Sequence, residues 1–390
     1  MNRAEIAAKI FRVAFDKLPG GDPRADHDAV AALGNCFLPL FLNGDQDILA
    51  PSRDIWANWL QQAEEANVVL PYQTPQERFS GKFPSYLESE AQIIEHILFA
   101  PLQGFKPDAQ PVLLDTMGLP VLLDTLGPPG GEKSTLLRRI QAAELPHSIL
   151  SDPDEGVLEN LGPYRLARAV KKLDEGRRGL EKLQGLPPAK YIGIRNLWRE
   201  PPYNTFRAAS NATNTQVTGK AVAEGQSVAF GWTGIKGYGL DVLIKQGYIP
   251  AGYRQDSLVT FADLETSQTL EGYRERPASP VDFVNKRIDY ILALPETLPI
   301  ADRARLFAVR LNQEPLLAAT LNPKLGIRDT VPDGVQAIRK ILEKEQTRLD
   351  QTKDERAGKF ASIRAWLETE AFGPSLPGRS LSRPDPKPTP

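Results

Sequence analysis

PVLLDTMGLPVLLDTLGPPGGEKSTLLRRI, residues Pro111–Ile140, is the most strongly patterned stretch of the sequence. It contains a tandem repeat of nine residues: VLLDTMGLP over 112–120 is followed directly by VLLDTLGPP over 121–129, and seven of the nine positions match. Each copy is a short apolar run that ends in Asp-Thr and is followed by glycine and proline. Since glycine allows positive φ and proline cannot continue a strand, the repeat predicts two strand–turn units that pack side by side.

The second copy runs into GPPGGEKST, residues Gly127–Thr135. This segment resembles the phosphate-binding loop of P-loop ATPases, G-x-x-x-x-G-K-[ST], and it lies between an apolar run and a predicted helix, as that loop requires. The resemblance implies Lys133 as the phosphate ligand, Ser134 as a Mg²⁺ ligand and Asp263 as a second metal carboxylate.

Glu132 departs from this pattern because it stands where the loop requires its last glycine. That glycine lets backbone N–H groups wrap around the phosphates, whereas a glutamate adds a side chain and a negative charge. The alternative interpretation of the segment is a Gly/Pro turn in which Ser134 or Thr135 caps the following helix.

The composition is that of an ordinary globular protein of 390 residues with a formal net charge of −2. The single cysteine, Cys36, excludes an intrachain disulfide and a thiolate metal cluster, and the three histidines lie far apart, which argues against a zinc hydrolase. We therefore expect no cofactor. Neither a signal peptide nor an apolar run long enough to span a bilayer is visible, so we expect no membrane partner and a location in the cytoplasm or within an assembled particle.

A basic segment over residues 164–207 is the strongest charge signal. It holds eleven lysines and arginines and four acidic residues, a net charge of +7, so the rest of the chain carries −9. Arginines can neutralise phosphates and aromatic rings can stack on bases, so the segment predicts contact with nucleic acid. The predicted contact residues are Lys171, Lys172, Arg195, Trp198, Arg199, Tyr203 and Arg207. The alternative is a solvated basic helix face followed by a strand whose aromatic residues enter the core.

The periodicities predict an α+β fold that is predominantly helical, with a helical N-terminal part, a short β-rich middle, and a long C-terminal helix with an extended proline-rich tail. The predicted parts are a helical domain over 1–100, the repeat and loop region over 101–160, a mixed region with the basic segment over 161–280, a helical region over 281–372, and the tail over 373–390. Trp56 and Trp59 share one helix face and are expected in the core.

Several elements are predicted along the middle and C-terminal parts. Residues 213–222 and 227–232 predict a hairpin, and 281–292 and 301–320 predict helices. Residues 333–372 predict a helix that either breaks near Gly358 or bridges two bodies across solvent. The tail, with six prolines over 373–390, is expected to be disordered or polyproline-like.

The sequence favours a non-enzymatic structural subunit of a larger assembly, such as a virion, capsid or nucleoprotein component. Its expected partners are copies of itself or other subunits, and nucleic acid. The alternative function is a phosphate- or nucleotide-binding protein that uses the degenerate loop at Gly127–Thr135. A third hypothesis, acid–base catalysis by carboxylates such as Asp115 and Asp124, depends on the repeat alone.

Overall fold

The computed structural model describes residues 2–8, 46–83, 86–103, 119–178, 201–231, 247–248, 250–272, 280–378 and 380–381. The chain divides into two compact units, each assembled from segments that are not consecutive in the sequence. The helical unit comprises Met1–Lys106, Ile149–Pro187 and Leu197–Gly225, and the sheet unit comprises Pro107–Ser148, Pro188–Asn196 and Gln226–Pro390.

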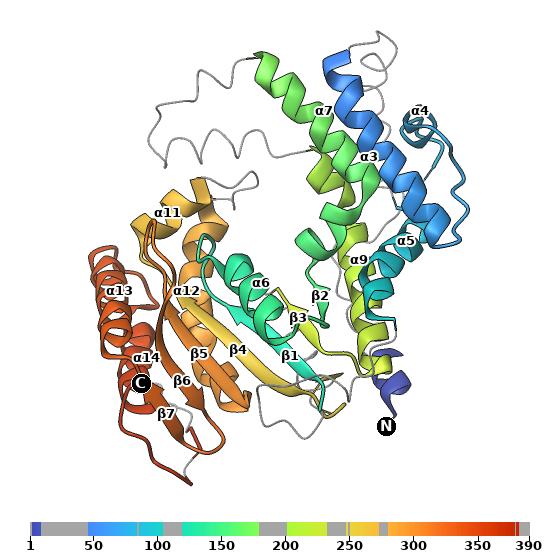
Figure 1. Cartoon of the computed structure of the whole chain (residues 1–390). Coiled ribbons are helices and arrows are strands. Elements are labelled where there is room, and N and C mark those ends of the chain that lie inside the picture. The colour runs from blue at the N-terminus through green and yellow to red at the C-terminus, as the bar shows by residue number, and fades with distance from the viewer. Residues whose placement is uncertain are drawn as a thin grey trace. The chain divides into compact units, whose positions relative to one another are not determined.

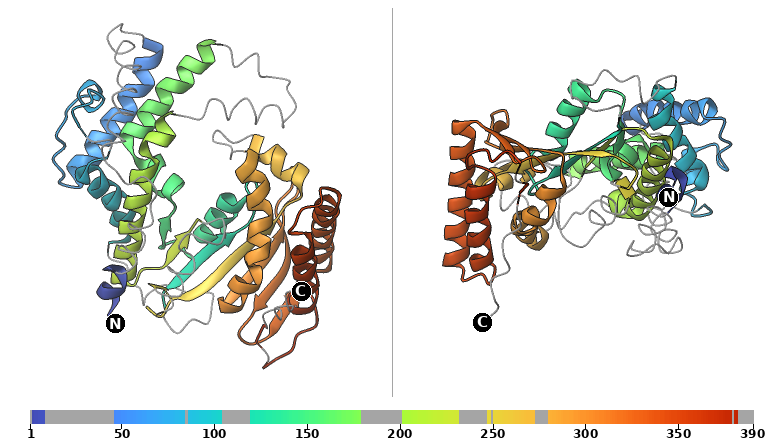
Figure 2. Two further views of the ribbon diagram at one scale, coloured as in Figure 1. Left: turned by 180° about the vertical axis from the view of Figure 1, so that it is seen from behind. Right: turned by 90° about the horizontal axis from the view of Figure 1, so that it is seen from below.

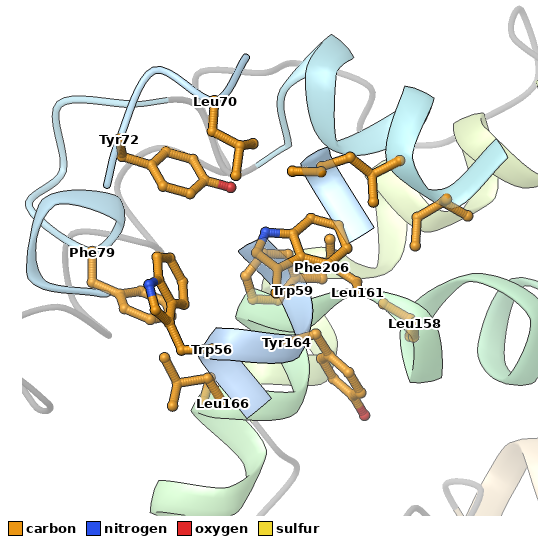
Figure 3. Close-up of a cluster of buried hydrophobic side chains, with 14 of the residues drawn as sticks. Trp56, Trp59, Leu70, Tyr72, Phe79, Leu158, Leu161, Tyr164, Leu166 and Phe206 are labelled. Carbon is orange, nitrogen blue, oxygen red and sulfur yellow. The ribbon is translucent and has the colours of Figure 1, made fainter. Parts of the chain in front are cut away.

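The helical unit packs its helices around an apolar cluster (Figures 1 and 3). Its described elements are α3 (Gln46–Glu65), α4 (Pro75–Arg78), α5 (Glu88–Phe99), η1 (Ala100–Leu102), β2 (Ile149–Ser151), a π-helical turn η3 (Pro153–Val157), η4 (Leu158–Asn160), α7 (Gly162–Arg178) and α9 (Pro201–Glu224). Trp56 and Trp59 of α3 are buried in this cluster, which confirms their predicted place in the core.

The predicted hairpin over residues 213–222 and 227–232 is wrong. Residues 213–222 belong to the long helix α9, and only Val228–Phe230 forms a strand, β3. The residues that α9 buries recur at helical spacing, namely Phe206, Ser210, Asn214, Val217 and Ala221. Because two of these five are small or amide polar residues, a search for apolar periodicity does not detect this face.

The sheet has seven strands in the order β2-β3-β1-β4-β5-β6-β7. In the sheet unit these are β1 (Val121–Leu126), β3, β4 (Arg254–Phe261), β5 (Arg303–Ala308), β6 (Leu316–Asn322) and β7 (Ile327–Thr330). β1 runs parallel to β3 on one side and to β4 on the other, and β4 runs parallel to β5. β6 and β7 complete the sheet in antiparallel register. The fold is therefore mixed α/β, and more α/β in character than the helix-dominated α+β class that was predicted.

The helices of the sheet unit are α6 (Lys133–Glu144), α11 (Leu264–Gly272), α12 (Pro280–Thr297), η7 (Leu298–Ile300), α13 (Pro332–Gln351) and α14 (Ala357–Glu370). α6 covers one face of the sheet and α12 the other (Figure 2). None of the helices that the structure describes is long and apolar enough to span a membrane.

The second copy of the repeat is a strand, β1, as predicted. Its two neighbours in the sheet are β3 and β4. The first copy, up to Gly118, lies outside the described residues.

The predicted helix over residues 301–320 is wrong, because this segment forms β5, a turn and the start of β6. Residues 333–372 do break, as one of the two predicted outcomes required: α13 ends at Gln351 and α14 begins at Ala357. Lys353 lies in this break with φ of 52°. The two helices contact each other, so they do not bridge two bodies.

The described part of the tail is ordered against the turn between β6 and β7, contrary to the prediction. The N–H groups of Leu376, Gly378 and Leu381 donate to the carbonyls of Gly326, Leu325 and Pro323 at 3.0, 3.0 and 2.8 Å. The side chain of Leu381 is buried. Residues 382–390 lie outside the described part of the chain.

Candidate phosphate-binding loop

The segment between β1 and α6 forms a tight loop at the carboxyl end of β1 (Figure 1). Gly127–Gly131 are buried, and Glu132–Ser134 are half-buried. The N–H of Gly131 donates to the carbonyl of Pro128 at 3.1 Å, which closes a turn. Gly130 has φ of 66°, the left-handed region that glycine enters without a steric penalty.

Glu132 takes a left-handed backbone conformation, which favours glycine, with φ of 53° and ψ of 21°. It is the N-cap residue of α6, and its side chain makes no capping hydrogen bond. The interpretation in which Ser134 or Thr135 caps the helix is therefore wrong, because both lie inside the first turn. A helix that begins without a side-chain cap has first-turn N–H groups with no helical acceptor, and such groups bind anions.

Lys133 folds back over the loop that precedes it. Its Nζ donates to the carbonyl oxygen of Pro128 at 2.7 Å. The ammonium group therefore lies beside the same backbone that supplies the N–H groups of the loop. An ammonium has three donors, so Lys133 can keep this hydrogen bond and still bind a phosphate oxygen.

The neighbouring strand β4 and helix α11 hold the loop in place. A Cβ added at Gly127 would come within 2.1 Å of Thr260 Oγ1, and one added at Gly130 would come within 2.3 Å of the Ser267 carbonyl oxygen. These approaches require glycine at both positions. The tight fit also means that the loop conformation is set before any ligand arrives.

Arg287 of α12 fixes the segment that supports the loop. Its buried guanidinium donates to the carbonyls of Ala262 and Asp263, both at 3.2 Å, and to Ser267 Oγ at 2.5 Å. It also pairs with the buried Glu345 of α13 at 3.1 Å. Nothing in the spacing of these residues marks them in the sequence, because each contact joins elements that are distant along the chain.

The loop occupies the position where open α/β sheets bind ligands. β3, β1, β4 and β5 are parallel, so their carboxyl ends lie at one edge of the sheet. β3 lies on one side of β1, and the chain then crosses from β3 to β4 on the other side of β1. The crevice at such a reversal of strand order is the general ligand site of these sheets.

Asp263, the predicted metal carboxylate, follows the end of β4 at the same edge. Its Oδ1 accepts from the N–H of Thr266 at 2.8 Å, and its Oδ2 accepts from Lys344 Nζ at 2.7 Å. Partial burial works to raise the pKa of Asp263, but the hydrogen bonds from Lys344 and Thr266 outweigh it and hold that pKa below its usual range. Asp263 is therefore an ionised carboxylate at neutral pH.

A cation at this edge would need ligands beyond those that the protein supplies. Among the described residues no group of three or more His, Cys, Asp and Glu side chains could hold a metal ion. Mg²⁺ commonly takes one or two protein oxygens and completes its shell with phosphates and water. The Ser134 hydroxyl and the Asp263 carboxylate are the candidates for those protein oxygens.

Asp124 lies within β1 and is completely buried. Burial raises its pKa to about 7, although hydrogen bonds from Ser257 and Gln255 act in the opposite direction. A carboxyl group enclosed in the sheet cannot reach a substrate, so the structure does not support Asp124 as an acid–base catalyst. Asp115 lies outside the described residues.

The predicted nucleic-acid-binding residues are described only in part. Tyr203 and Arg207 both lie on α9, where the Arg207 guanidinium is 5.5 Å from the Tyr203 ring centroid and pairs with Asp154. Lys171 and Lys172 lie in α7, although their side chains are outside the described part of the structure. Arg195, Trp198 and Arg199 also lie outside it. Contact of this set with nucleic acid stays a prediction.

Comparison with known proteins gives matches among solved structures only. No family model and no curated protein matches the sequence. A chain of the PezAT chromosomal toxin–antitoxin system of the human pathogen Streptococcus pneumoniae matches at 15% identity and a TM-score of 0.37, over 68% of this chain and 97% of that one. A chain of the AvrRxo1-ORF1:-ORF2 complex with ATP matches at 17% identity and a TM-score of 0.36, over 81% of this chain and 94% of that one.

The predicted non-enzymatic structural subunit of a virion, capsid or nucleoprotein assembly is wrong. The bridging helix that supported this function is two helices, and the described part of the tail packs on its own sheet. A partnership with copies of itself stays a prediction.

Proposed function

We propose that this protein binds the phosphate groups of a nucleotide, as its metal complex, at Gly127–Thr135. The observation that carries the proposal is the conformation of the loop. It closes on itself at the carboxyl end of a central parallel strand, Lys133 lies across it, and an uncapped helix begins directly after it.

The loop supplies the two kinds of group that a polyphosphate needs. The first turn of α6 offers backbone N–H groups together with the positive end of the helix dipole, equivalent to about half an elementary charge. Lys133 adds a full positive charge at the same place. Because β4 and α11 already hold the backbone, binding does not have to order the loop, and this entropy cost is avoided.

A divalent cation fits the same arrangement. Ser134 is half-buried at the second position of α6, which is the position of the metal-binding hydroxyl in the motif that this loop resembles. The Asp263 carboxylate lies at the end of the adjacent strand and is ionised. When bound, the cation would neutralise part of the phosphate charge, and the phosphates would supply most of its ligands.

The proposal is tested by measuring the affinity of the full chain for ATP with Mg²⁺ by calorimetry, with inorganic triphosphate as a second ligand. Lys133→Ala removes the ammonium group and should weaken binding by about tenfold to a hundredfold, since a hydrogen bond to a charged group contributes about 1.5–3 kcal/mol. Lys359→Ala, at an exposed lysine of α14, is the matched control and should leave the affinity unchanged.

Two results would overturn the proposal: the unaltered chain binds neither ligand, or Lys133→Ala binds as tightly as Lys359→Ala does. If triphosphate binds as well as ATP, the loop recognises the phosphates alone. If ATP binds more tightly, the base and ribose contribute as well, and the protein is specifically a nucleotide-binding protein.

A further inference from the structure

We infer that Glu132 determines specificity in this loop, by making it select phosphate accompanied by a divalent cation over free phosphate. The inference rests on the proposed function and goes beyond it, because it assigns a role to the residue by which the loop departs from its motif. It follows from the backbone conformation of Glu132, its charge and its place in the chain.

The backbone conformation shows that the loop keeps its shape although Glu132 replaces the last glycine of the motif. Besides Glu132, the non-glycine residues with positive φ in the described part of the chain are Asn67, Asn312 and Lys353. Asparagine tolerates this region because its short side chain can bond locally, whereas glutamate has no such advantage. Glu132 is therefore held in the left-handed region by the loop around it, and the N–H groups of the loop keep the directions that a glycine would give them.

Glu132 brings a negative charge next to the helix start at which a phosphate would bind. Its side chain is half-buried and forms no capping hydrogen bond with α6. Glu132 directly precedes Lys133 and the first turn of α6. A glutamate side chain is shorter than the screening length of about 8 Å at physiological salt, so every rotamer leaves the carboxylate within effective range of a phosphate on these N–H groups.

Free polyphosphate would therefore meet a negative charge beside the groups that attract it. A divalent cation changes the sign of this interaction. Mg²⁺ bound to the phosphates neutralises part of their charge, and a carboxylate is one of the ligands that Mg²⁺ accepts. The same Glu132 side chain that repels metal-free phosphate is thus neutral or favourable toward the metal complex.

The test compares the dissociation constant of ATP with Mg²⁺ and with EDTA, for the unaltered chain, Glu132→Gln and Glu132→Gly. Glu132→Gln removes the charge and keeps the size of the side chain. It should tighten metal-free ATP binding by about fivefold to tenfold and reduce the preference for the metal complex by the same factor, as expected for two charges about 7 Å apart near a protein surface at physiological salt. Glu132→Gly also removes the charge and should show the same reduced preference, while relief of the left-handed backbone should raise the stability of the fold.

Glu355→Gln, at an exposed glutamate between α13 and α14, is the control and should change neither constant. Thermal unfolding of each variant shows whether its fold is intact. The inference fails if the unaltered chain binds ATP and Glu132→Gln keeps the same preference for the metal complex. The proposed function itself fails if neither the unaltered chain nor either Glu132 variant binds ATP under any of these conditions. Binding that appears only in the Glu132 variants would contradict both the inference and the proposed function, because Glu132 would then block the loop instead of selecting the metal complex.

Discussion

The loop region over residues 119–144 and the basic segment over residues 164–207 each predict a binding site in the sequence. The structure shows that the positive groups of the two regions have different surroundings. In the loop region, Lys133 donates to the carbonyl of Pro128, and Gly127 and Gly130 have no room for a side chain. In the basic segment, Arg168 and Arg207 form ion pairs with Glu159 and Asp154. The described arginines of the basic segment therefore share their charge with carboxylates, whereas the Lys133 ammonium donates to a backbone carbonyl, which carries no net charge.

The comparison shows why a charge count is a weaker guide than a backbone motif. Both acidic partners precede residue 164, so a count over the basic segment omits the charges that neutralise it. A loop motif, in contrast, specifies where a turn, a lysine and a helix start lie relative to one another. Its chemistry and its geometry are therefore read from the same few residues.

The largest effect in the loop region is expected from Asp124, in the strand that carries the loop. The folded chain keeps the Asp124 proton up to about pH 7, whereas the unfolded chain loses it near the ordinary value of 3.8. Between these values the folded state binds more protons, so the free energy of unfolding falls as pH rises from about 4 to about 7. The full difference is about three pKa units, or about 4 kcal/mol.

Asp124→Asn should remove this decline and make the chain more stable than the unaltered protein at pH 8, by an amount approaching that figure. Asparagine can accept from Gln255 Nε2, which now donates to Asp124 Oδ2 at 3.2 Å, and its own amide can donate to Gln255 Oε1. Urea unfolding at pH 4.5 and pH 8 measures the effect. Asp329→Asn, at an exposed position of β7, is the control. Parallel pH profiles for Asp124→Asn and the unaltered chain would contradict this prediction.

The next effect concerns the glycines of the loop. Gly130→Ala places a Cβ against the Ser267 carbonyl oxygen in a left-handed conformation, and should lower the free energy of unfolding by about 2 kcal/mol and weaken ATP binding. Gly358→Ala is the matched substitution, because a Cβ there meets nothing within 4 Å and its residue lies in α14. It should stabilise the chain by up to about 1 kcal/mol.

Urea unfolding of both variants measures this difference. Equal effects of Gly130→Ala and Gly358→Ala would show that the loop can move away from α11, and that its conformation is not set in advance by the surrounding packing.

The sequence predicts those parts of the fold whose signals are local. β1 follows from its apolar run, and the break between α13 and α14 follows from a polar middle over 343–359. The strands β5 and β6 were predicted as helix because β5 is buried along nearly its whole length, so its residues show no alternation between apolar and polar. Their leucines and alanines also have high helix propensity.

The loop of the candidate site could be predicted from the sequence, but the residues that pack against the loop could not. Gly127, Lys133 and Ser134 belong to one motif, and the end of β4 was identified through Asp263. Thr260, Ser267 and Arg287 reach the loop only through the packing of β4, α11 and α12. The sequence also indicated that Glu132 breaks the motif. Only the structure shows that its backbone still follows the path of the missing glycine.

The smallest effect is expected in the basic segment and tests the other half of the comparison. Arg207 pairs with Asp154, and their side chains are 33% and 28% exposed, so solvent screens the attraction between them. Arg207→Ala and Asp154→Asn should each lower the free energy of unfolding by less than about 1 kcal/mol, and a double-mutant cycle should give a coupling of about 0.2–1 kcal/mol that declines with salt. A coupling indistinguishable from zero at low salt would mean that Asp154 does not neutralise Arg207. The contrast between the two regions would then be lost.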